Sequence, residues 1–264
     1  MAGTPRRSAG LRHGLPTVIG GLGIVVALSA LLVWLAPDLV GAAPATCLAS
    51  TGRCFCEAVG AGLLRQPANA LSSLSFAVAA VAILRLPTAR QSTPTRSLHR
   101  ALAAACVALA AGSLAYHARL TMAGQWLDVQ GMYLVAVLLV AVAASRHRSW
   151  TASRVTVLTV VLLASLALAQ AFWPDSRRWV FAVVLLPGIV AEWRTASDRR
   201  PLRAGVLTLL IGYAAWLADE RGWLCEPTSW AQGHALWHLL TAGAAYLMSV
   251  HLSRNPLPEN GVRQ

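Results

Sequence analysis

The sequence predicts an all-α fold, a polytopic membrane helical bundle with a seven-helix core and one extra N-terminal transmembrane helix. The first observation is composition: 56% of the 264 residues are hydrophobic and 12% are charged, and the mean hydropathy is +0.57, which is too apolar for a soluble domain of this size. The second is that apolar runs recur along the whole chain. The third is that the basic residues, all of them arginine, fall between those runs.

Eight apolar runs are long enough to approach or cross a bilayer. The sixth and seventh fall short of the about 20 residues that a span needs, and Pro187-Gly188 interrupts the sixth. We count both, because dropping either would reverse the membrane orientation of every later segment. In chain order the predicted helices are Leu15–Ala36, Pro67–Leu84, Ala101–Ala118, Leu127–Ser145, Val155–Trp173, Trp179–Ala191, Ala204–Ala218 and Gly233–Leu252.

The N-terminal helix has two interpretations. A basic start, an apolar stretch and the small residues at 41–45 are also typical of a cleaved signal peptide. The apolar run is longer than the usual core of a signal peptide, so we favour an uncleaved anchor. The chain then divides into a cytoplasmic tail with its anchoring helix, residues 1–36, and a seven-helix membrane domain, residues 37–264.

The arginine distribution predicts the orientation in the membrane. With the N-terminus in the cytoplasm, six of the 22 arginines lie outside and sixteen inside, in agreement with the positive-inside rule. We expect a multi-pass protein of the plasma (inner) membrane. Because the arginines form no basic patch with interleaved aromatic residues, nucleic acid is not an expected partner. The six outer arginines are Arg53, Arg65, Arg119, Arg177, Arg178 and Arg221.

Four of the five cysteines fall in segments that this topology places outside, where an oxidising environment permits disulfides. We favour a pair between Cys56 and Cys225, with Cys47 and Cys54 as a second, local pair. Sequence does not fix the connectivity of four cysteines, so free thiols at one or both pairs remain the alternative. Cys106 lies in the middle of a predicted helix.

Candidate functional side chains gather at the outer ends of three predicted helices. His234 and His238 are spaced i, i+4 and share one face at the start of the last helix, and Ser113 and His117 share a face at the end of the third. Asp128 begins the fourth helix after a short turn. Ionisable groups at membrane depth are costly and rare, so their common depth predicts that they meet.

Three histidine ligands without a fourth strong protein ligand are the arrangement of a catalytic zinc, because one tetrahedral position stays open for water. Zinc lowers the pKa of that water to about 7. Asp128 is then the expected acid and base, which takes the proton of the water and passes it to a leaving nitrogen. Ser113 is expected to stabilise the oxyanion or to orient the water.

Each of these residues also has a simpler interpretation. Ser113 alone would most often bond back to a carbonyl of its own helix, and Asp128 could cap its helix or pair with Arg119. We expect His251 to be a packed, hydrogen-bonded residue. His13, His99 and His147 lie among arginines, so we expect them to be solvated. A serine protease is not favoured, because no Gly-x-Ser-x-Gly elbow surrounds Ser113. A metal transporter is not favoured either, because it needs acidic residues along a path through several helices, and only Asp128 lies clearly within an apolar span.

Five motifs occur together in the sequence: Cys56-Glu57, the stretch from Gln66 to Phe76, Gly112-Ser113 with His117, Gly124-Gln125 with Asp128, and His234 with Trp237-His238. With these motifs the sequence resembles the alkaline ceramidase family, which belongs to a wider group of seven-helix membrane hydrolases that includes the adiponectin receptors. The resemblance covers roughly residues 54–252. It implies a zinc-dependent amidase that cleaves the N-acyl bond of ceramide-like lipids, with zinc on His117, His234 and His238, Asp128 as acid and base and Ser113 at the oxyanion. It also implies a Cys56–Cys225 disulfide.

The sequence departs from the family pattern in three places. Eukaryotic members carry a calcium site around the Cys-Glu motif, and here only Glu57, and loosely Gln66, occupy comparable positions, which argues against calcium (Ca2+) regulation. The extra N-terminal helix and the short loop between Cys225 and His234 also differ. We therefore expect a bacterial-type member that acts with water on ceramide or on a related N-acyl membrane lipid. The alternative is a non-catalytic, zinc-stabilised seven-helix receptor or lipid-binding protein, which would keep the three histidines.

Overall fold

The structure is a computed structural model that describes residues 43–87, 92–148, 152–173, 176–223 and 225–257. Regular secondary structure in these ranges is helical, apart from an isolated antiparallel bridge between Pro44 and Thr121. The predicted N-terminal helix, Leu15–Ala36, lies outside the described residues, so the division of the chain at residue 36 stays a prediction. The helices are α3 (Thr46–Thr51), α4 (Pro67–Ser72), α5 (Leu74–Leu84), α6 (Thr93–Arg119), α7 (Met122–Arg148), α8 (Ala152–Phe172), α9 (Arg177–Thr195), α10 (Arg200–Glu220) and α11 (Gly233–Arg254).

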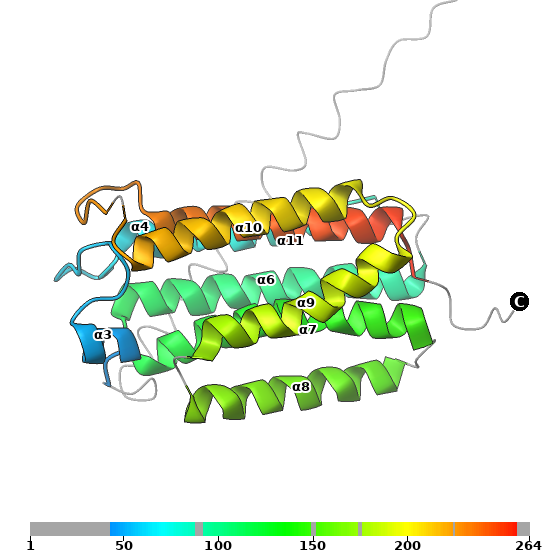
Figure 1. The fold of residues 1–264 in the computed structure, drawn as a ribbon, viewed down its shortest axis with the longest axis horizontal. Helices are drawn as coiled ribbons and strands as arrows, with labels where there is room; N and C mark the ends of the chain where they lie inside the picture. The colour runs from blue at the N-terminus through cyan, green and yellow to red at the C-terminus, as the bar shows by residue number, and fades with distance from the viewer. Residues whose placement is uncertain (1–42, 88–91, 149–151, 174–175, 224, 258–264) are drawn as a thin grey trace, which may run out of the picture.

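The long helices run side by side along one axis (Figure 1). α6 packs along α7, α10 packs along α11, and α5 contacts both α6 and α11. α9 packs on α7, and α8 packs on α7 at the edge of the bundle. Five segments of the described chain are long and apolar enough to cross a membrane: α4 with α5, α6, α7, α10 and α11. The prediction of an all-α, multi-pass membrane bundle is therefore confirmed.

Several helix boundaries differ from the predicted ones. The predicted helix Pro67–Leu84 is two helices that meet at Ser73. α6 begins eight residues before the apolar run, because the Ser92 side chain accepts a hydrogen bond from the backbone N–H of Thr95 and caps a polar first turn. α7 begins at Met122, so Asp128 lies in its second turn and not at its start.

The sixth predicted segment also needs a correction. α9 continues through Pro187 without a break, although a proline removes one backbone hydrogen bond. A Cβ atom at Gly188 would lie 2.9 Å from Cγ of Leu139 and 3.2 Å from the backbone nitrogen of Val140. Glycine at this position lets α9 pack closely on α7, as small residues do between membrane helices.

Two further glycines bring α6 and α7 together. A Cβ atom at Gly112 would lie 2.9 Å from the carbonyl carbon of Leu127 and 3.1 Å from the backbone nitrogen of Asp128, and one at Gly131 would lie 2.8 Å from Cα of Leu109. The two backbones therefore approach more closely than larger residues allow. This contact sets Ser113, the residue after Gly112, beside Asp128.

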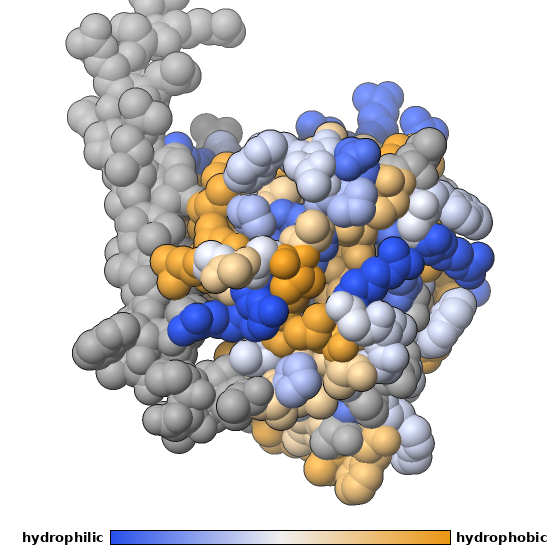
Figure 2. Space-filling model, turned by 90° about the vertical axis from the view of Figure 1, so that its left-hand side faces the viewer, coloured by the Kyte–Doolittle hydropathy of each residue, from blue (hydrophilic) through white to orange (hydrophobic). Residues whose placement is uncertain are grey.

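Two disulfides hold the loops at the α3 end of the bundle. They join Cys47 to Cys54 and Cys56 to Cys225. The second ties the segment before α4 to the loop before α11, across 169 positions of sequence. Figure 2 looks onto this end and shows hydrophobic residues exposed among hydrophilic ones.

A buried polar network lies at the opposite end. Arg146 binds both carboxylate oxygens of Glu192 at 3.0 and 3.2 Å, and His251 binds one of them at 3.0 Å. His251 is thus packed and hydrogen-bonded, as the sequence predicts. The expectation of a solvated His99 is wrong, because His99 is buried with its Nε2 atom 3.1 Å from the carbonyl oxygen of Ser249. α6 begins at Thr93, so the apolar run Ala101–Ala118 did not include His99, which faces the bundle.

Candidate metal centre

The three predicted histidine ligands meet inside the bundle. His117 comes from the last turn of α6, and His234 and His238 come from the first two turns of α11. All three are buried, and each offers one nitrogen within 4.8 Å of the others. The Nε2 atoms of His117 and His234 lie 3.2 Å apart, close to the spacing of about 3.3 Å between two nitrogens on one tetrahedral metal. The cluster can hold a metal ion.

The hydrogen bond of His117 fixes which ring nitrogen carries its proton. The Nε2 amide of Gln66 donates to the carbonyl oxygens of Cys54 and Glu57, so its Oε1 atom is the one that faces His117. Oε1 can only accept, and it lies 2.9 Å from Nδ1 of His117. His117 therefore carries its proton on Nδ1, and the lone pair of Nε2 points into the cluster.

The same logic applies to His238. The hydroxyl of Ser72 donates to the carbonyl oxygen of Asn69, so it accepts from Nδ1 of His238 at 2.8 Å. Metal-binding histidines in proteins usually donate their second N–H in this way, which orients the ring. The donor set thus fits a metal on observed contacts, and both outer partners lie in the stretch from Gln66 to Phe76.

Ser113 and Asp128 lie next to the histidines. The oxygen of Ser113 is 3.4 Å from Nε2 of His238 and accepts a hydrogen bond from Ser73 at 3.0 Å. Ser113 also interacts with the buried carboxylate of Asp128, near which Arg177 supplies positive charge. Because Asp128 lies inside α7, it does not cap that helix. The structure therefore brings all five predicted residues to one place.

Phe55 forms a wall of the cluster that sequence reasoning missed. Its ring stacks on His234 at 3.7 Å with an interplanar angle of 16°, and it lies 5.5 Å from the ring of His117. The residue has a positive φ of 64°, which is uncommon for a bulky side chain. Its two neighbours, Cys54 and Cys56, are both in disulfides, and these cross-links hold the turn that places the ring.

Asp219 is a second residue that the sequence did not reveal. It is buried, and its two carboxylate oxygens accept hydrogen bonds from the backbone N–H groups of Cys56 at 2.8 Å and His234 at 3.0 Å. A carboxylate at the N-terminus of a helix also interacts favourably with the helix dipole. Asp219 thus joins the ends of α10 and α11 to the loop that carries Phe55.

Glu57, the candidate calcium ligand, has a different environment. Its carboxylate oxygens accept from the backbone N–H groups of Ala68 at 2.7 Å and Asn69 at 2.9 Å, in the first turn of α4. Burial raises the pKa of Glu57, and these two hydrogen bonds act in the opposite direction. Both oxygens are engaged in anchoring α4, so the side chain has a structural task. The expectation that calcium does not regulate the protein stays a prediction.

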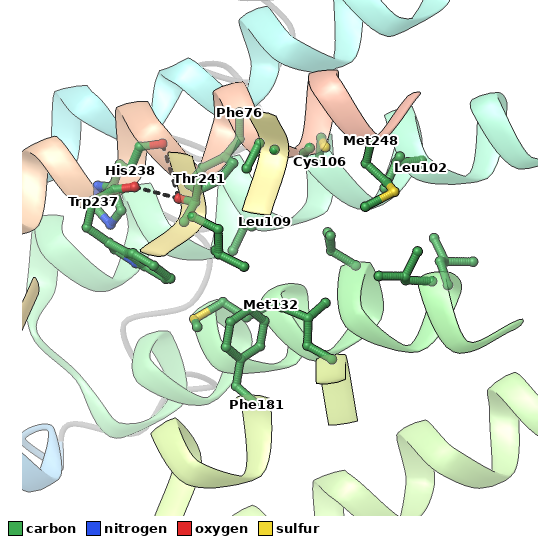
Figure 3. Close-up of a pocket in the computed structure, with 18 of the residues that line it drawn as sticks. Phe76, Leu102, Cys106, Leu109, Met132, Phe181, Trp237, His238, Thr241 and Met248 are labelled. Atoms are coloured by element: carbon green, nitrogen blue, oxygen red, sulfur yellow. Dashed lines mark hydrogen bonds between the residues drawn. The ribbon is translucent and has the colours of Figure 1, made fainter. Parts of the chain in front are cut away.

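An apolar cavity leads away from the histidines into the bundle. Asp128, His234 and His238 line one end of it, and Leu98, Val142 and Leu252 line it far along α6, α7 and α11. Figure 3 shows its length, with Trp237 and His238 at one side and Leu102 and Met248 at the other. The walls between these ends are almost entirely hydrophobic.

The fold and the site together define a class: an all-α, multi-pass membrane protein with a buried three-histidine cluster that opens on an apolar cavity. A comparison with known protein families identifies the family within this class. The Ceramidase family model matches residues 64–261, so the chain belongs to the ceramidase family, and it is a hydrolase of the ceramide amide bond. A search of curated proteins found no match to the chain.

Proposed function

We propose that the protein is a zinc-dependent intramembrane amidohydrolase that cleaves the N-acyl bond of ceramide or a related N-acyl lipid. The observation that carries this proposal is the direction of the imidazoles. The Nδ1 atoms of His117 and His238 are bound by Gln66 and Ser72, which leaves their Nε2 lone pairs for a metal. A ligand set of three imidazoles is typical of zinc sites that keep one position open for catalysis.

His117, His234 and His238 would hold the zinc ion in this proposal. Zinc at such a site lowers the pKa of a coordinated water to about 7 and so supplies hydroxide near neutral pH. The aromatic wall of Phe55 and Trp216 keeps bulk water away from His234. Electrostatic interactions are stronger in such a water-poor site.

Asp128 and Ser113 supply the remaining chemistry. The Asp128 carboxylate takes the proton of the attacking water as it adds to the carbonyl carbon, and then passes this proton to the amide nitrogen as the C–N bond breaks. The products are a fatty acid and a free amine. The Ser113 hydroxyl, which already interacts with Asp128, stabilises the oxyanion that forms at the carbonyl oxygen.

The surface of the bundle supports a lipid substrate that enters from the membrane. α9 and α10 contact each other much less than they contact α7 and α11 respectively, and both line the cavity through residues such as Leu185 and Leu209. This sparsely packed seam is the proposed lateral entrance. Large apolar side chains are exposed along both helices, as expected for a surface that faces lipid: Val183, Leu186, Leu207, Leu210 and Ile211.

Exposed tryptophans support a position of the site near the membrane surface. Trp173, Trp179, Trp223 and Trp230 are each more than 60% exposed at the end of the bundle that holds the histidines. Tryptophan side chains are enriched where the membrane meets water. We therefore propose that the metal site lies just below the membrane surface and, with the arginine distribution, on the outer side.

The test is release of fatty acid by purified, zinc-loaded protein from a panel of N-acyl sphingoid and related lipids. We expect Asp128→Asn to lower kcat by about 100-fold or more while zinc content stays the same. The matched control is Asp198→Asn, which changes an aspartate at the other end of the bundle, where it pairs with Arg254. If stoichiometric zinc is bound but no lipid is cleaved, and Asp128→Asn changes nothing, the protein is instead a zinc-stabilised receptor or lipid-binding protein.

A further inference from the structure

Buried apolar side chains lie at the far end of the cavity behind the histidines. We infer that this cavity binds one straight hydrocarbon chain of the lipid along the bundle axis, and that Leu98, Val142 and Leu252 set the longest chain that fits. This inference rests on the proposed function, because it names the part of the substrate that the cavity takes. It concerns chain-length selectivity at the bottom of the cavity, at the opposite end from the reacting groups.

Leu98, Val142 and Leu252 form the floor of the cavity. They come from three helices, and the segment after α11 packs behind them. Val142 and Leu252 are buried against Leu257, and Leu98 packs on the same cluster. Leu257 is fixed from both sides of its backbone: its N–H donates to Thr95 at 2.9 Å, and its carbonyl oxygen accepts from Ser92 at 2.7 Å. The segment after α11 therefore closes the bundle between the ends of α6, α7 and α11.

The residues behind the floor make it costly to extend a chain further. Arg146, one helical turn after Val142, binds Glu192, and it also donates to the backbone carbonyls of Asn255 and Pro256. His251, next to Leu252, binds the same glutamate. A longer chain would have to separate these buried charged groups, and breaking a buried ion pair is strongly destabilising.

The depth of the cavity can be estimated from its walls. The path from His238 to Leu252 along α11 and the path from Asp128 to Val142 along α7 have the same length. Each is about 21 Å at the rise of an α-helix, which matches an extended saturated chain of about sixteen carbons. Both walls therefore predict the same limit for the chain.

Small side chains leave the cavity open at half its depth. Ala245 lies midway between His238 and Leu252, and Cys106 and Val135 lie at the corresponding positions of α6 and α7; all three line the cavity. A phenylalanine at position 245 would occupy this level. It should reduce the usable length to about half, or about eight carbons.

The experiment measures kcat/KM for two series of N-acyl sphingoid lipids in mixed micelles. One series varies the acyl chain with a fixed base, and the other varies the base with a fixed acyl chain. For the wild type we expect a cut-off near the predicted length in one series, which identifies the chain that the cavity binds. Beyond the cut-off, kcat/KM should fall by about tenfold or more, because a closed apolar pocket discriminates at this scale for a single methylene.

Two variants should move the cut-off in opposite directions. Ala245→Phe should shift it to shorter chains, and Val142→Ala combined with Leu252→Ala should shift it to longer ones. Val157→Ala, on the exposed side of α8, is the matched control and should leave it in place. Absence of a cut-off in both series, or a cut-off that neither variant moves, would overturn the inference while the proposed function stands.

A binding readout keeps the inference testable if no lipid is cleaved. Cys106 is a buried free cysteine, and it lines the cavity at half depth. Fatty acids long enough to reach that level should slow its reaction with a small thiol reagent, whereas shorter ones should not. Equal protection by short and long fatty acids would overturn the inference independently of any hydrolysis.

Discussion

The side-chain amide of Gln66 holds the ring of His117 from behind, with Oε1 2.9 Å from Nδ1. Its nitrogen is occupied by two backbone carbonyls, so the amide cannot turn round and offer a donor. Gln66 is fully buried. The residue thus connects the loop around Cys54 and Glu57 to the metal cluster and determines which nitrogen of His117 faces it.

The first prediction concerns this contact. Gln66→Leu keeps a side chain of similar size but removes the acceptor, so His117 is free to rotate or change tautomer. We expect zinc affinity to fall by about 10-fold to 100-fold, the usual effect of losing such an outer partner. Competition with a chelator of known affinity measures it. The matched control is Gln170→Leu, which removes a glutamine bonded to Gln130 in α7; equal affinities in the two variants would contradict the orienting role.

The second prediction concerns the ligands. Removal of one of three imidazoles from a buried site should cost most of the bound metal, so His234→Ala should have a zinc content well below stoichiometric by elemental analysis. His99→Ala removes another buried histidine, one that bonds to Ser249 at the opposite end of the bundle. It should bind zinc like the wild type. Full zinc occupancy in His234→Ala would rule out the three-histidine site.

The sequence predicted the residues of the functional cluster better than it predicted the residues that hold them in place. The i, i+4 spacing of His234 and His238 fixes a shared helix face, and the arginine distribution brought His117 to the same depth. These are local patterns and a topology rule. Asp219 was not recognised because it looks like an ordinary acid at a helix end, and its two partners are backbone N–H groups that only the folded chain brings near.

For the helices, the sequence predicted the middle of each one better than its ends. Apolar runs located the membrane-facing middle of each helix, but α6 starts in the polar segment that Ser92 caps, where hydropathy carries no signal. Pro187 was expected to interrupt α9, yet the helix continues because Gly188 lets it pack on α7. Tertiary packing therefore outweighs a local preference at Pro187, whereas the start of α6 depends on a local cap.

The third prediction concerns orientation. Cys54→Ser releases the half-buried Cys47 from its disulfide, and the proposed topology places Cys47 outside the cell. An impermeant thiol reagent applied to intact cells should label this variant without reductant. The control is Ser253→Cys, in the last turn of α11 at the other end of the bundle, which should be labelled only after the membrane is opened. The reverse pattern would invert the topology and place the metal site on the cytoplasmic side.

The fourth prediction concerns Asp219. Asp219→Ala removes the acceptor for the buried N–H groups of Cys56 and His234, and hydrogen bonds to a charged group are worth about 1.5–3 kcal/mol each. We expect the free energy of unfolding to fall by about 3 kcal/mol, with a lower midpoint of thermal unfolding in detergent. Zinc occupancy should fall as well, because Asp219 fixes the backbone at His234.

The matched control for this change is Asp198→Ala. Asp198 also bonds to a backbone N–H, that of Arg200, and to the side chain of Arg254, but it lies at the surface, where water can replace it. Its unfolding midpoint should stay close to that of the wild type. If the two alanine variants unfold at the same temperature, Asp219 does not hold the α10 and α11 ends to the Cys56 loop, and the placement of His234 must come from the Cys56–Cys225 disulfide and the stacking of Phe55 instead.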